Sequence, residues 1–231
     1  MSEAAAAAPY GWGPFFSLVK RHGFSPRVVL DIGANRGNWT RTALAHFPEA
    51  KFMLVEPQEA LKVHVADLLE SRPAQVRWLT AGASDRPGRM PLTIAPRDDS
   101  SSFVPTPEQA AAAGFPQALV EVTTIDRIVA DAGGAIPEMV KIDAEGFDLK
   151  ALAGAASLFG RTDIFFLEAA VCATGIDNTM ARVVSAMDAA GYRMIDITDI
   201  NRSPRHGVLW LCELAFMRAG CPLLEKIRSY E

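Results

Sequence analysis

The sequence is poor in cysteine, and its basic residues do not outnumber its acidic ones. Its three cysteines, Cys172, Cys212 and Cys221, form no Cys-x-x-Cys pair and have no histidine at zinc-motif spacing. This pattern favours reduced, mostly buried thiols in a cytoplasmic protein. The net charge of −4 gives no support for a nucleic-acid-binding surface, so we expect no nucleic acid among the partners.

The sequence also lacks long apolar runs. The longest are interrupted by Glu168 and Glu213, so they fall well short of a membrane span. The first residues read MSEAAAAAPYGWG, whereas a secretory signal needs a basic start and a longer apolar stretch. We therefore expect a soluble protein without a membrane partner.

The composition is that of an ordinary globular protein, with 49% apolar and 22% charged residues among 231. A chain of this length suits one large domain with a substantial core. We assign residues 27–231 to a single domain and residues 1–26 to an N-terminal arm or leading helix.

Strand-like and helix-like segments alternate from residue 27 onward, which favours a parallel sheet covered by helices. Trp39, Ala43 and Phe47 recur at steps of four after Gly37, which predicts a helix that ends at Pro48. Further helices are expected through Leu61, Val65, Leu68 and Leu69, over 147–158, and through Met180, Val183, Val184 and Met187 up to Gly191. Strands are expected at 28–31, 51–55, 76–80, 139–142, 164–167, 192–197 and 208–217, with the last one antiparallel.

The stretch 84–120 interrupts this alternation because it is rich in proline, glycine, serine and aspartate. It contains one short strand-like segment, 90–94, and is followed by a strand-like segment at 120–125 that we place near a sheet edge. Long irregular connections in compact domains are often functional lids. We expect this stretch to cover the cofactor edge of the sheet, with a β-hairpin inside it.

The segment VVLDIGANRGNWT, residues 28–40, passes from a strand through a loop into a helix. Dinucleotide-binding loops read Gly-x-Gly-x-x-Gly, but here Asn35 stands where the middle glycine would approach a pyrophosphate. Asp31, Gly33, Asn35 and Gly37 therefore suit a nucleoside cofactor without a pyrophosphate, and S-adenosylmethionine is the leading candidate. Free N–H groups at the start of the helix would bind its carboxylate.

Two further segments fit the same cofactor. Glu56 ends the second strand 23 residues after Gly33, close to where an acid commonly binds ribose hydroxyls. Small residues at 81–85 follow the third strand and leave room for an adenine ring, with Ala83 and Ser84 as candidate contacts. A plain turn at 81–85 explains the same residues equally well.

Charged residues surround one apolar position in Lys141-Ile142-Asp143-Ala144-Glu145-Gly146. Asp143 ends a buried strand near the middle of the sheet, so we place the reaction edge there. Glu145 alone also has a simpler explanation, because an acid is favoured near the start of a helix. The set of three charges makes Asp143 and Glu145 candidate catalytic groups and Asp143 a candidate cofactor contact.

Glu168 and His206 are the remaining candidates. Glu168 follows the strand 164–167 on the same edge, and with Asp143 it suits a hard cation such as Mg²⁺. A solvent-facing acid at a strand end is the alternative. His206 lies in a polar loop, 201–207, and is a candidate general base, although an exposed histidine without a role is the more common outcome.

The motifs VVLDIGANRGNW…LVEP and VKIDAEGFD resemble those of the FkbM family of S-adenosylmethionine-dependent methyltransferases. The resemblance runs from about Arg27 to Arg218. It implies a class I methyltransferase fold, with a seven-stranded, mostly parallel sheet, an antiparallel last strand and helices on both faces. It also implies methylation of hydroxyl oxygens on sugars or secondary metabolites. Asp148 stands where the family pattern has glutamate, so no role is carried over to it.

The resemblance also implies roles for the matching residues. The loop contacts would come from Asp31, Gly33, Asn35 and Gly37, the ribose contact from Glu56, and the reaction edge from Lys141, Asp143 and Glu145. The expected partner is a small-molecule acceptor, and a homodimer is left open. Two alternatives remain: an NAD-dependent oxidoreductase, which the missing middle glycine disfavours, and a non-catalytic module that binds the cofactor.

Overall fold

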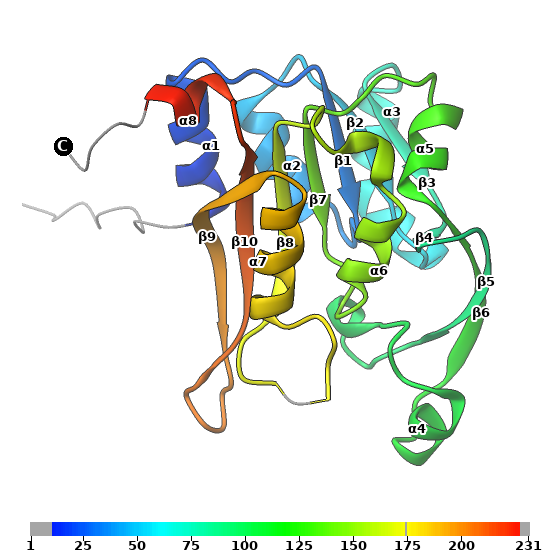
Figure 1. Cartoon of the computed structure of the whole chain (residues 1–231). Helices are drawn as coiled ribbons and strands as arrows, with labels where there is room; N and C mark the ends of the chain where they lie inside the picture. The colour runs from blue at the N-terminus through cyan, green and yellow to red at the C-terminus, as the bar shows by residue number, and fades with distance from the viewer. Residues whose placement is uncertain (1–10, 174, 227–231) are drawn as a thin grey trace, which may run out of the picture.

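A mixed seven-stranded sheet separates two layers of helices (Figure 1). The computed structural model describes residues 11–173 and 175–226, and residues 1–10 of the predicted arm lie outside it. The strand order is β3-β2-β1-β7-β8-β10-β9. Neighbouring strands pair in parallel except β10, which is antiparallel to both β8 and β9. The predicted sheet and its antiparallel last strand are confirmed.

The strands of this sheet mostly have the predicted bounds. They are β1 (Val28–Ile32), β2 (Lys51–Val55), β3 (Val76–Leu79), β7 (Met139–Ile142), β8 (Ile164–Ala170), β9 (Tyr192–Arg202) and β10 (Leu209–Arg218). Two of them are longer than predicted. Strand β8 continues to Ala170, so Glu168 lies inside the strand rather than at its end. Strand β9 continues to Arg202, which leaves only a short turn before β10.

Alternate residues of each strand face opposite helical layers. Val29 and Phe166 pack against α1 (Trp12–Arg21), α2 (Asn38–His46) and α3 (Ala66–Ser71), together with the C-terminal α8 (Pro222–Lys226). Leu30 and Leu167 pack against α5 (Ile125–Asp131), α6 (Asp148–Ala153) and α7 (Met180–Ala189) on the other face. Because β1 and β7 are covered on both faces, they read as nearly continuous apolar runs.

The stretch after β3 forms a second sheet with the order β4-β6-β5. It consists of β4 (Gly82–Ala83), β5 (Gly88–Thr93) and β6 (Gln117–Thr123), with η2 (Asp98–Ser100) and α4 (Pro107–Ala112) between β5 and β6. The antiparallel pair β5–β6 confirms the predicted hairpin. The strand predicted at 120–125 corresponds to β6. Its placement near a sheet edge is wrong, because β6 is the middle strand of the second sheet. Alternation of polar and apolar residues indicates a strand with one exposed face. Such a strand can lie in the middle of a half-exposed sheet as well as at its edge.

Two predicted helices are broken. The helix predicted through Leu61, Val65, Leu68 and Leu69 is a 3₁₀ helix, η1 (Glu59–Val65), followed by α3. The helix predicted over 147–158 is α6 followed by η3 (Ala156–Leu158), with Gly154 between them. A Cβ atom on Gly154 would lie 2.2 Å from the carbonyl oxygen of Ser84, so the chain passes too close for any larger residue. Thr124 and Ile125 begin α5 rather than end a strand, since the Thr124 hydroxyl accepts a hydrogen bond from the Arg127 N–H.

Helix α1 contributes Phe15, Phe16 and Val19 to the core cluster of the α2 face. The boundary that separates an arm from a domain at residues 26 and 27 stays a prediction. Cys212 and Cys221 are buried as expected, but Cys172 is exposed.

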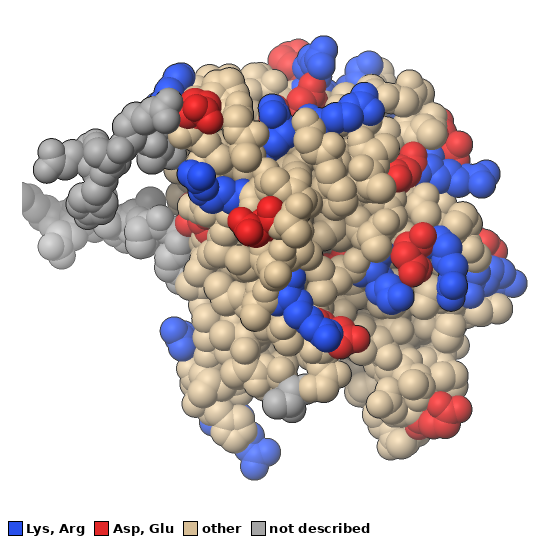
Figure 2. All heavy atoms as spheres, viewed as in Figure 1, with Lys and Arg blue, Asp and Glu red and all other residues tan. Residues whose placement is uncertain are grey.

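The surface carries charges of both signs. Figure 2 shows basic and acidic side chains interspersed on one face, without a continuous patch of either sign. The absence of a nucleic-acid partner stays a prediction. No helix within residues 11–173 and 175–226 has the length and apolar character that a membrane crossing requires.

Phe16 is fully buried, and its ring meets those of Trp39, Phe47 and Phe166 at centroid distances of 5.4, 5.7 and 5.9 Å. We expect Phe16→Ala to lower the free energy of unfolding by about 3–5 kcal/mol, because it leaves a cavity between α1 and the sheet. Urea denaturation measures the loss. The matched control is Phe115→Ala at a half-exposed ring, where we expect a change within about 0.5 kcal/mol. Equal losses in the two variants would contradict the packing of α1.

Candidate active site

The loop between β1 and α2 approaches the end of β7 very closely. Gly33 has φ +72°, and a Cβ atom there would lie 1.8 Å from the carbonyl oxygen of Asp143. Gly37 has φ +76°, and its Cβ atom would lie 2.5 Å from a methyl group of Val65. Asn35 also has a positive φ, +49°, which asparagine tolerates better than most residues. The two glycines are therefore required by the packing of the loop, independently of any ligand.

Every amide of this loop already has a partner in the chain. The N–H groups of Gly33 and Ala34 donate to the carbonyl oxygen of Val55, and that of Gly37 donates to Ala34. The remaining amides are those of Asn35, which donates to Glu56 Oε2, and Arg36, which donates to Asn35 Oδ1. The free N–H groups expected to bind a carboxylate at the start of the helix are therefore not those of residues 33–37, and this expectation stays a prediction. The first turn of α2 is the nearest helix start that such a group would meet.

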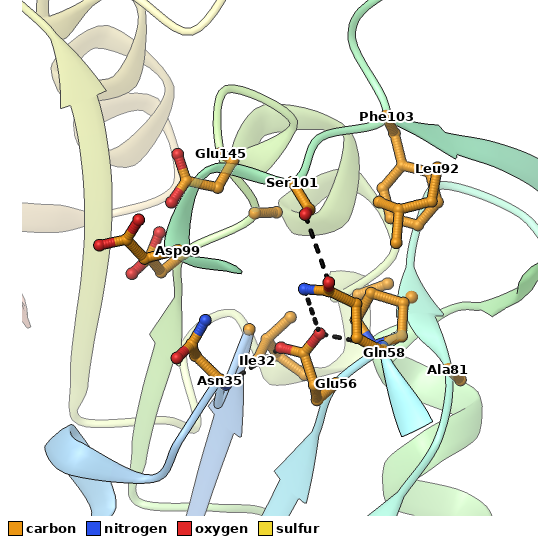
Figure 3. A pocket seen from close by; sticks show the side chains of 16 residues that line it. Ile32, Asn35, Glu56, Gln58, Ala81, Leu92, Asp99, Ser101, Phe103 and Glu145 are labelled. Atoms are coloured by element: carbon orange, nitrogen blue, oxygen red, sulfur yellow. Dashed lines mark hydrogen bonds between the residues drawn. The ribbon is translucent and has the colours of Figure 1, made fainter. Parts of the chain in front are cut away.

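Glu56 lies at the end of β2 with only 3% of its surface exposed. Its Oε1 accepts hydrogen bonds from the backbone and side chain of Gln58, at 3.0 and 3.4 Å. Burial raises the pKa of Glu56, and its hydrogen bonds with Gln58 and Asn35 oppose this rise. Figure 3 shows Glu56, Gln58 and Ser101 connected along one side of a pocket.

Lys141 is a buried cation beneath the loop. Its Nζ lies 3.0 Å from Asp143 Oδ2 and 3.7 Å from Asp31 Oδ1, and it donates to the Gly33 carbonyl oxygen at 3.3 Å. Burial alone would lower the pKa of Lys141, but the charges of Asp143, Asp31 and Glu213 raise it above its usual value. Lys141 is therefore a permanent positive charge that holds β1, β7 and the loop together.

Asp31 is completely buried, and its carboxylate lies beside Lys141 and Thr40. Its Oδ2 accepts a hydrogen bond from the Thr40 hydroxyl at 2.5 Å. Burial raises its pKa, while Lys141 and Thr40 counteract the rise.

Carboxyl groups gather on the other side of Asp143. One oxygen from each of Asp143, Glu145 and Glu168 lies within 4.8 Å of the others. Burial, together with the neighbouring acids, raises the pKa of Glu145 to about 9 and that of Glu168 well above its usual range. Asp148 is completely buried, its pKa is raised by burial, and its Oδ2 has no hydrogen-bond partner. Burial and mutual repulsion therefore favour proton binding by Glu145, Asp148 and Glu168 relative to isolated carboxyl groups.

The three converging carboxyl groups have the ligand chemistry that a hard divalent cation prefers. Sequence reasoning offered Asp143 and Glu168 for this role, and Glu145 joins them in space. Acidic groups at protein surfaces often converge without an ion, and these three are half-buried, so a bound Mg²⁺ stays a prediction.

Two cavities meet at this edge. The smaller, of about 70 Å³, is lined by residues that include Gly33, Asn35, Glu56, Ala83 and Phe103. The larger, of about 820 Å³, is lined by residues that include Glu168, His206, Trp12 and Trp210. Residues from the β1–α2 loop, η2 and the segment after β7 line both cavities: Gly33, Asn35, Asp99, Asp143 and Glu145. The buried Oδ1 of Asp143 has no hydrogen-bond partner at this boundary.

The structure separates the sequence-predicted site residues into four groups. Asp143 and Glu145 lie where the cavities meet, with Gly33 and Asn35 beside them, whereas Glu56 and Ala83 line only the smaller cavity. Glu168 and the exposed His206 line only the larger one. The residues that line neither cavity are Asp31, Gly37 and Ser84. Ser84 is buried, and its hydroxyl donates to Asp85.

Sequence reasoning missed several lining residues. Gln58 lines the smaller cavity, Asp99 lines both cavities, and Trp12 and Trp210 line the larger one. Gln58 could have been inferred from its place two residues after Glu56. The two tryptophans come from opposite ends of the chain, and no local pattern marks them as neighbours of the site.

The sequence matches a family model described as "Methyltransferase FkbM domain" over residues 31–194. Among solved structures, a putative O-methyltransferase from Klebsiella pneumoniae is 11% identical with a TM-score of 0.53, covering 95% of this chain and 84% of that one. The O-methyltransferase TomG from Streptomyces achromogenes, solved in complex with SAM, is 12% identical with a TM-score of 0.51 and the same coverage of 95% and 84%. These likenesses confirm the class I methyltransferase fold. No curated protein matches the sequence.

Glu213 of β10 is 6% exposed, and its Oε1 accepts hydrogen bonds from Trp12 Nε1 and the Thr198 hydroxyl. Burial raises its pKa from 4.5 to about 7, against the charge of Lys141. A raised carboxyl pKa means that the folded protein binds the proton more tightly than the unfolded chain. The protonated Glu213 carboxyl therefore makes its full contribution to the free energy of unfolding below pH 4.5. This contribution is lost as the pH rises to about 7.

Glu213→Gln keeps a side-chain oxygen for Trp12 and Thr198 but cannot ionise. Relative to the wild type, we expect the variant to gain about 3 kcal/mol of unfolding free energy between pH 4.5 and 8. Urea denaturation across that range measures the difference. The exposed Glu49→Gln serves as the control, and a Glu213→Gln curve parallel to the wild-type curve would contradict the assignment.

Proposed function

The chain belongs to the FkbM family of methyltransferases, and from that premise we propose that it methylates a hydroxyl oxygen of a small sugar-like or secondary-metabolite-type acceptor. S-adenosylmethionine is the methyl donor of this family. When bound, it supplies an activated methyl group on a sulfonium. Membership in a methyltransferase family argues against the alternative of an NAD-dependent oxidoreductase.

The smaller cavity has the donor set that this cofactor needs. Glu56 presents a carboxylate that is fixed by Gln58 and Asn35, in keeping with an acceptor for ribose hydroxyls. Ala81, Gly82 and Ala83 line the same cavity with little side-chain volume, which suits an adenine ring. The small volume of about 70 Å³ is bounded partly by Ser101 and Phe103, which lie between η2 and α4 (Figure 3). Binding would therefore need this side to open.

One observation supports methyl transfer most strongly: Asp143 belongs to both cavities and has an unpartnered oxygen. Lys141 fixes Asp143 Oδ2, so Oδ1 remains to accept a hydrogen bond or a proton from an acceptor hydroxyl. Alignment of the two reactants and exclusion of water then supply most of the rate enhancement. A hydroxyl must lose its proton during attack, and a positioned carboxylate is a suitable base.

Glu145 is less suited to this role. Its pKa of about 9 keeps it protonated at neutral pH, so it would donate a hydrogen bond rather than accept a proton. His206 lines the larger cavity but not the smaller one, and its imidazole is exposed. We therefore assign proton acceptance to Asp143 and leave His206 as an acceptor-side contact.

Calorimetry with S-adenosylhomocysteine tests the donor site. We expect micromolar binding by the wild type, and Glu56→Ala should weaken it at least about 10-fold because the ribose loses its hydrogen-bond acceptor. Gly33→Val should abolish binding, since its side chain would overlap Asp143. Glu49→Ala, at an exposed position, is the matched control, and thermal melts report folding. No binding by the intact wild type would sink the proposal.

The charge of Asp143 should matter for turnover more than for cofactor affinity. We expect Asp143→Asn to bind S-adenosylhomocysteine within a few-fold of the wild type and to lose at least about 100-fold in kcat. The assay follows methyl transfer to the first acceptor found in a panel of sugars and small phenols. Normal turnover by Asp143→Asn would show that the reaction edge lies elsewhere.

A further inference from the structure

Much of the wall of the larger cavity lies outside the part of the chain that matches the family model. The match covers residues 31–194, whereas Trp12 precedes it and Asp199, Asn201, Ser203 and Trp210 follow it. The residues at the boundary of the two cavities, such as Gly33 and Asp143, all lie within the match. The two ends of the chain therefore supply a part of the site that family membership does not specify.

Trp12 offers this cavity the carbon surface of its indole. Its only polar atom, Nε1, donates to Glu213 Oε1 at 2.8 Å, and Glu213 also accepts from Thr198. Because the N–H group is already used, contact between Trp12 and a ligand would be apolar or stacking. The buried carboxylate fixes the ring at the start of α1, which reduces the entropy cost of holding it in place for a ligand.

Trp210 is placed by a β-bulge. Leu209 pairs with Arg202 and Leu211 with Asn201, so Trp210 is an extra residue in β10 without a partner in β9. Bulges re-aim side chains and occur often beside active sites. Trp210 remains 40% exposed while it lines the cavity, which is unusual for so large an aromatic side chain.

Polar side chains line the cavity from the neighbouring strand. Asp199, Asn201 and Ser203 occupy alternate positions along β9 and the turn after it, and all three line the larger cavity. Alternate residues of a strand share one face and lie about 7 Å apart. This row offers carboxylate, amide and hydroxyl groups beside aromatic carbon surface, with Asp199 and Asn201 on one face of β9 and Ser203 just after the strand.

We propose that Trp12 and Trp210, together with the row Asp199, Asn201 and Ser203, form an acceptor subsite that selects a saccharide ring. A pyranose has apolar C–H faces that stack on indole rings and an edge of hydroxyl groups that the polar row can bind. A phenol would use the indoles but leave most of the row without partners, which is costly for polar groups that a ligand desolvates. The subsite rests on the proposed function only for its role in methyl transfer, because ring binding is a property of the cavity itself.

Saturation-transfer NMR tests the subsite with two matched panels, methyl glycosides of common hexoses and monosubstituted phenols. The spectra are recorded with and without S-adenosylhomocysteine. We expect the wild type to bind at least one methyl glycoside more tightly than any phenol. Trp12→Ala and Trp210→Ala should each weaken that glycoside at least about 10-fold through loss of the stacking surface. Asn201→Ala should weaken the glycoside more than the phenols.

Trp78→Phe is the control, because Trp78 lines neither cavity and its Nε1 donates to Thr80. Thermal melts establish that each variant folds. Trp210→Ala keeps the test decisive even if Trp12→Ala loosens α1, since Trp210 is partly exposed. Unchanged glycoside binding by Trp210→Ala overturns the proposal. It is also overturned if the wild type binds phenols but no glycoside, or binds neither panel.

The calorimetry with S-adenosylhomocysteine separates this outcome from the proposed function. Glycoside binding that depends on Trp210, in a protein that does not bind the cofactor product, would uphold the subsite and reject the methyltransferase assignment to these cavities. Binding of S-adenosylhomocysteine without glycoside binding would uphold the methyltransferase assignment and reject the saccharide subsite.

Discussion

The buried Lys141 is the interaction on which the site depends. Its ammonium group neutralises Asp31 and Asp143 and also bonds the Gly33 carbonyl oxygen, so one cation connects β1, β7 and the glycine loop. A buried charge of this kind is stable only when its partners are in place, and removal of a partner leaves an uncompensated charge. The requirement fixes the ends of the two central strands relative to each other. The boundary between the two cavities is built on those strand ends.

Lys141 cannot neutralise every acid around it. Glu145, Asp148 and Glu168 lie beyond its direct contacts, and burial together with mutual repulsion raises their pKa values. Asp143 differs from these neighbours because Lys141 Nζ lies 3.0 Å from its Oδ2. Pairs of acids with divergent environments are a common way to separate the proton acceptor from the hydrogen-bond donor in one active site. A divalent cation would reverse this arrangement by making all three converging carboxylates its ligands.

The parts that sequence reasoning predicted correctly depend on local pattern. Strands such as β2 and β7 follow from apolar runs, and the fold follows from their alternation with helices. Asp31 interacts with Lys141 and Thr40, and Gly37 packs against Val65, while their contact with the cofactor stays a prediction. The fold prediction failed where neighbours in space, rather than local pattern, decide the structure. Strand β6 has the pattern of an edge strand but pairs on both sides. The bulge at Trp210 arises from the way β10 pairs with β9, and the sequence of either strand alone does not determine that pairing.

The site is built from two parts of the chain, the segment that matches the family model and the segments on either side of it. The matched segment, residues 31–194, contains the glycine loop, Glu56 and Asp143, whose positions are all tied to the central strands. The proposed acceptor wall comes from α1 and the β9–β10 hairpin, and it meets the rest of the site where β10 pairs with β8. Substitutions in that wall can alter which rings bind without disturbing Lys141 or the donor cavity. The Trp12–Glu213 contact joins α1 to β10 within the acceptor wall, and the charge of Glu213, which acts on Lys141, couples that wall to the donor side of the site.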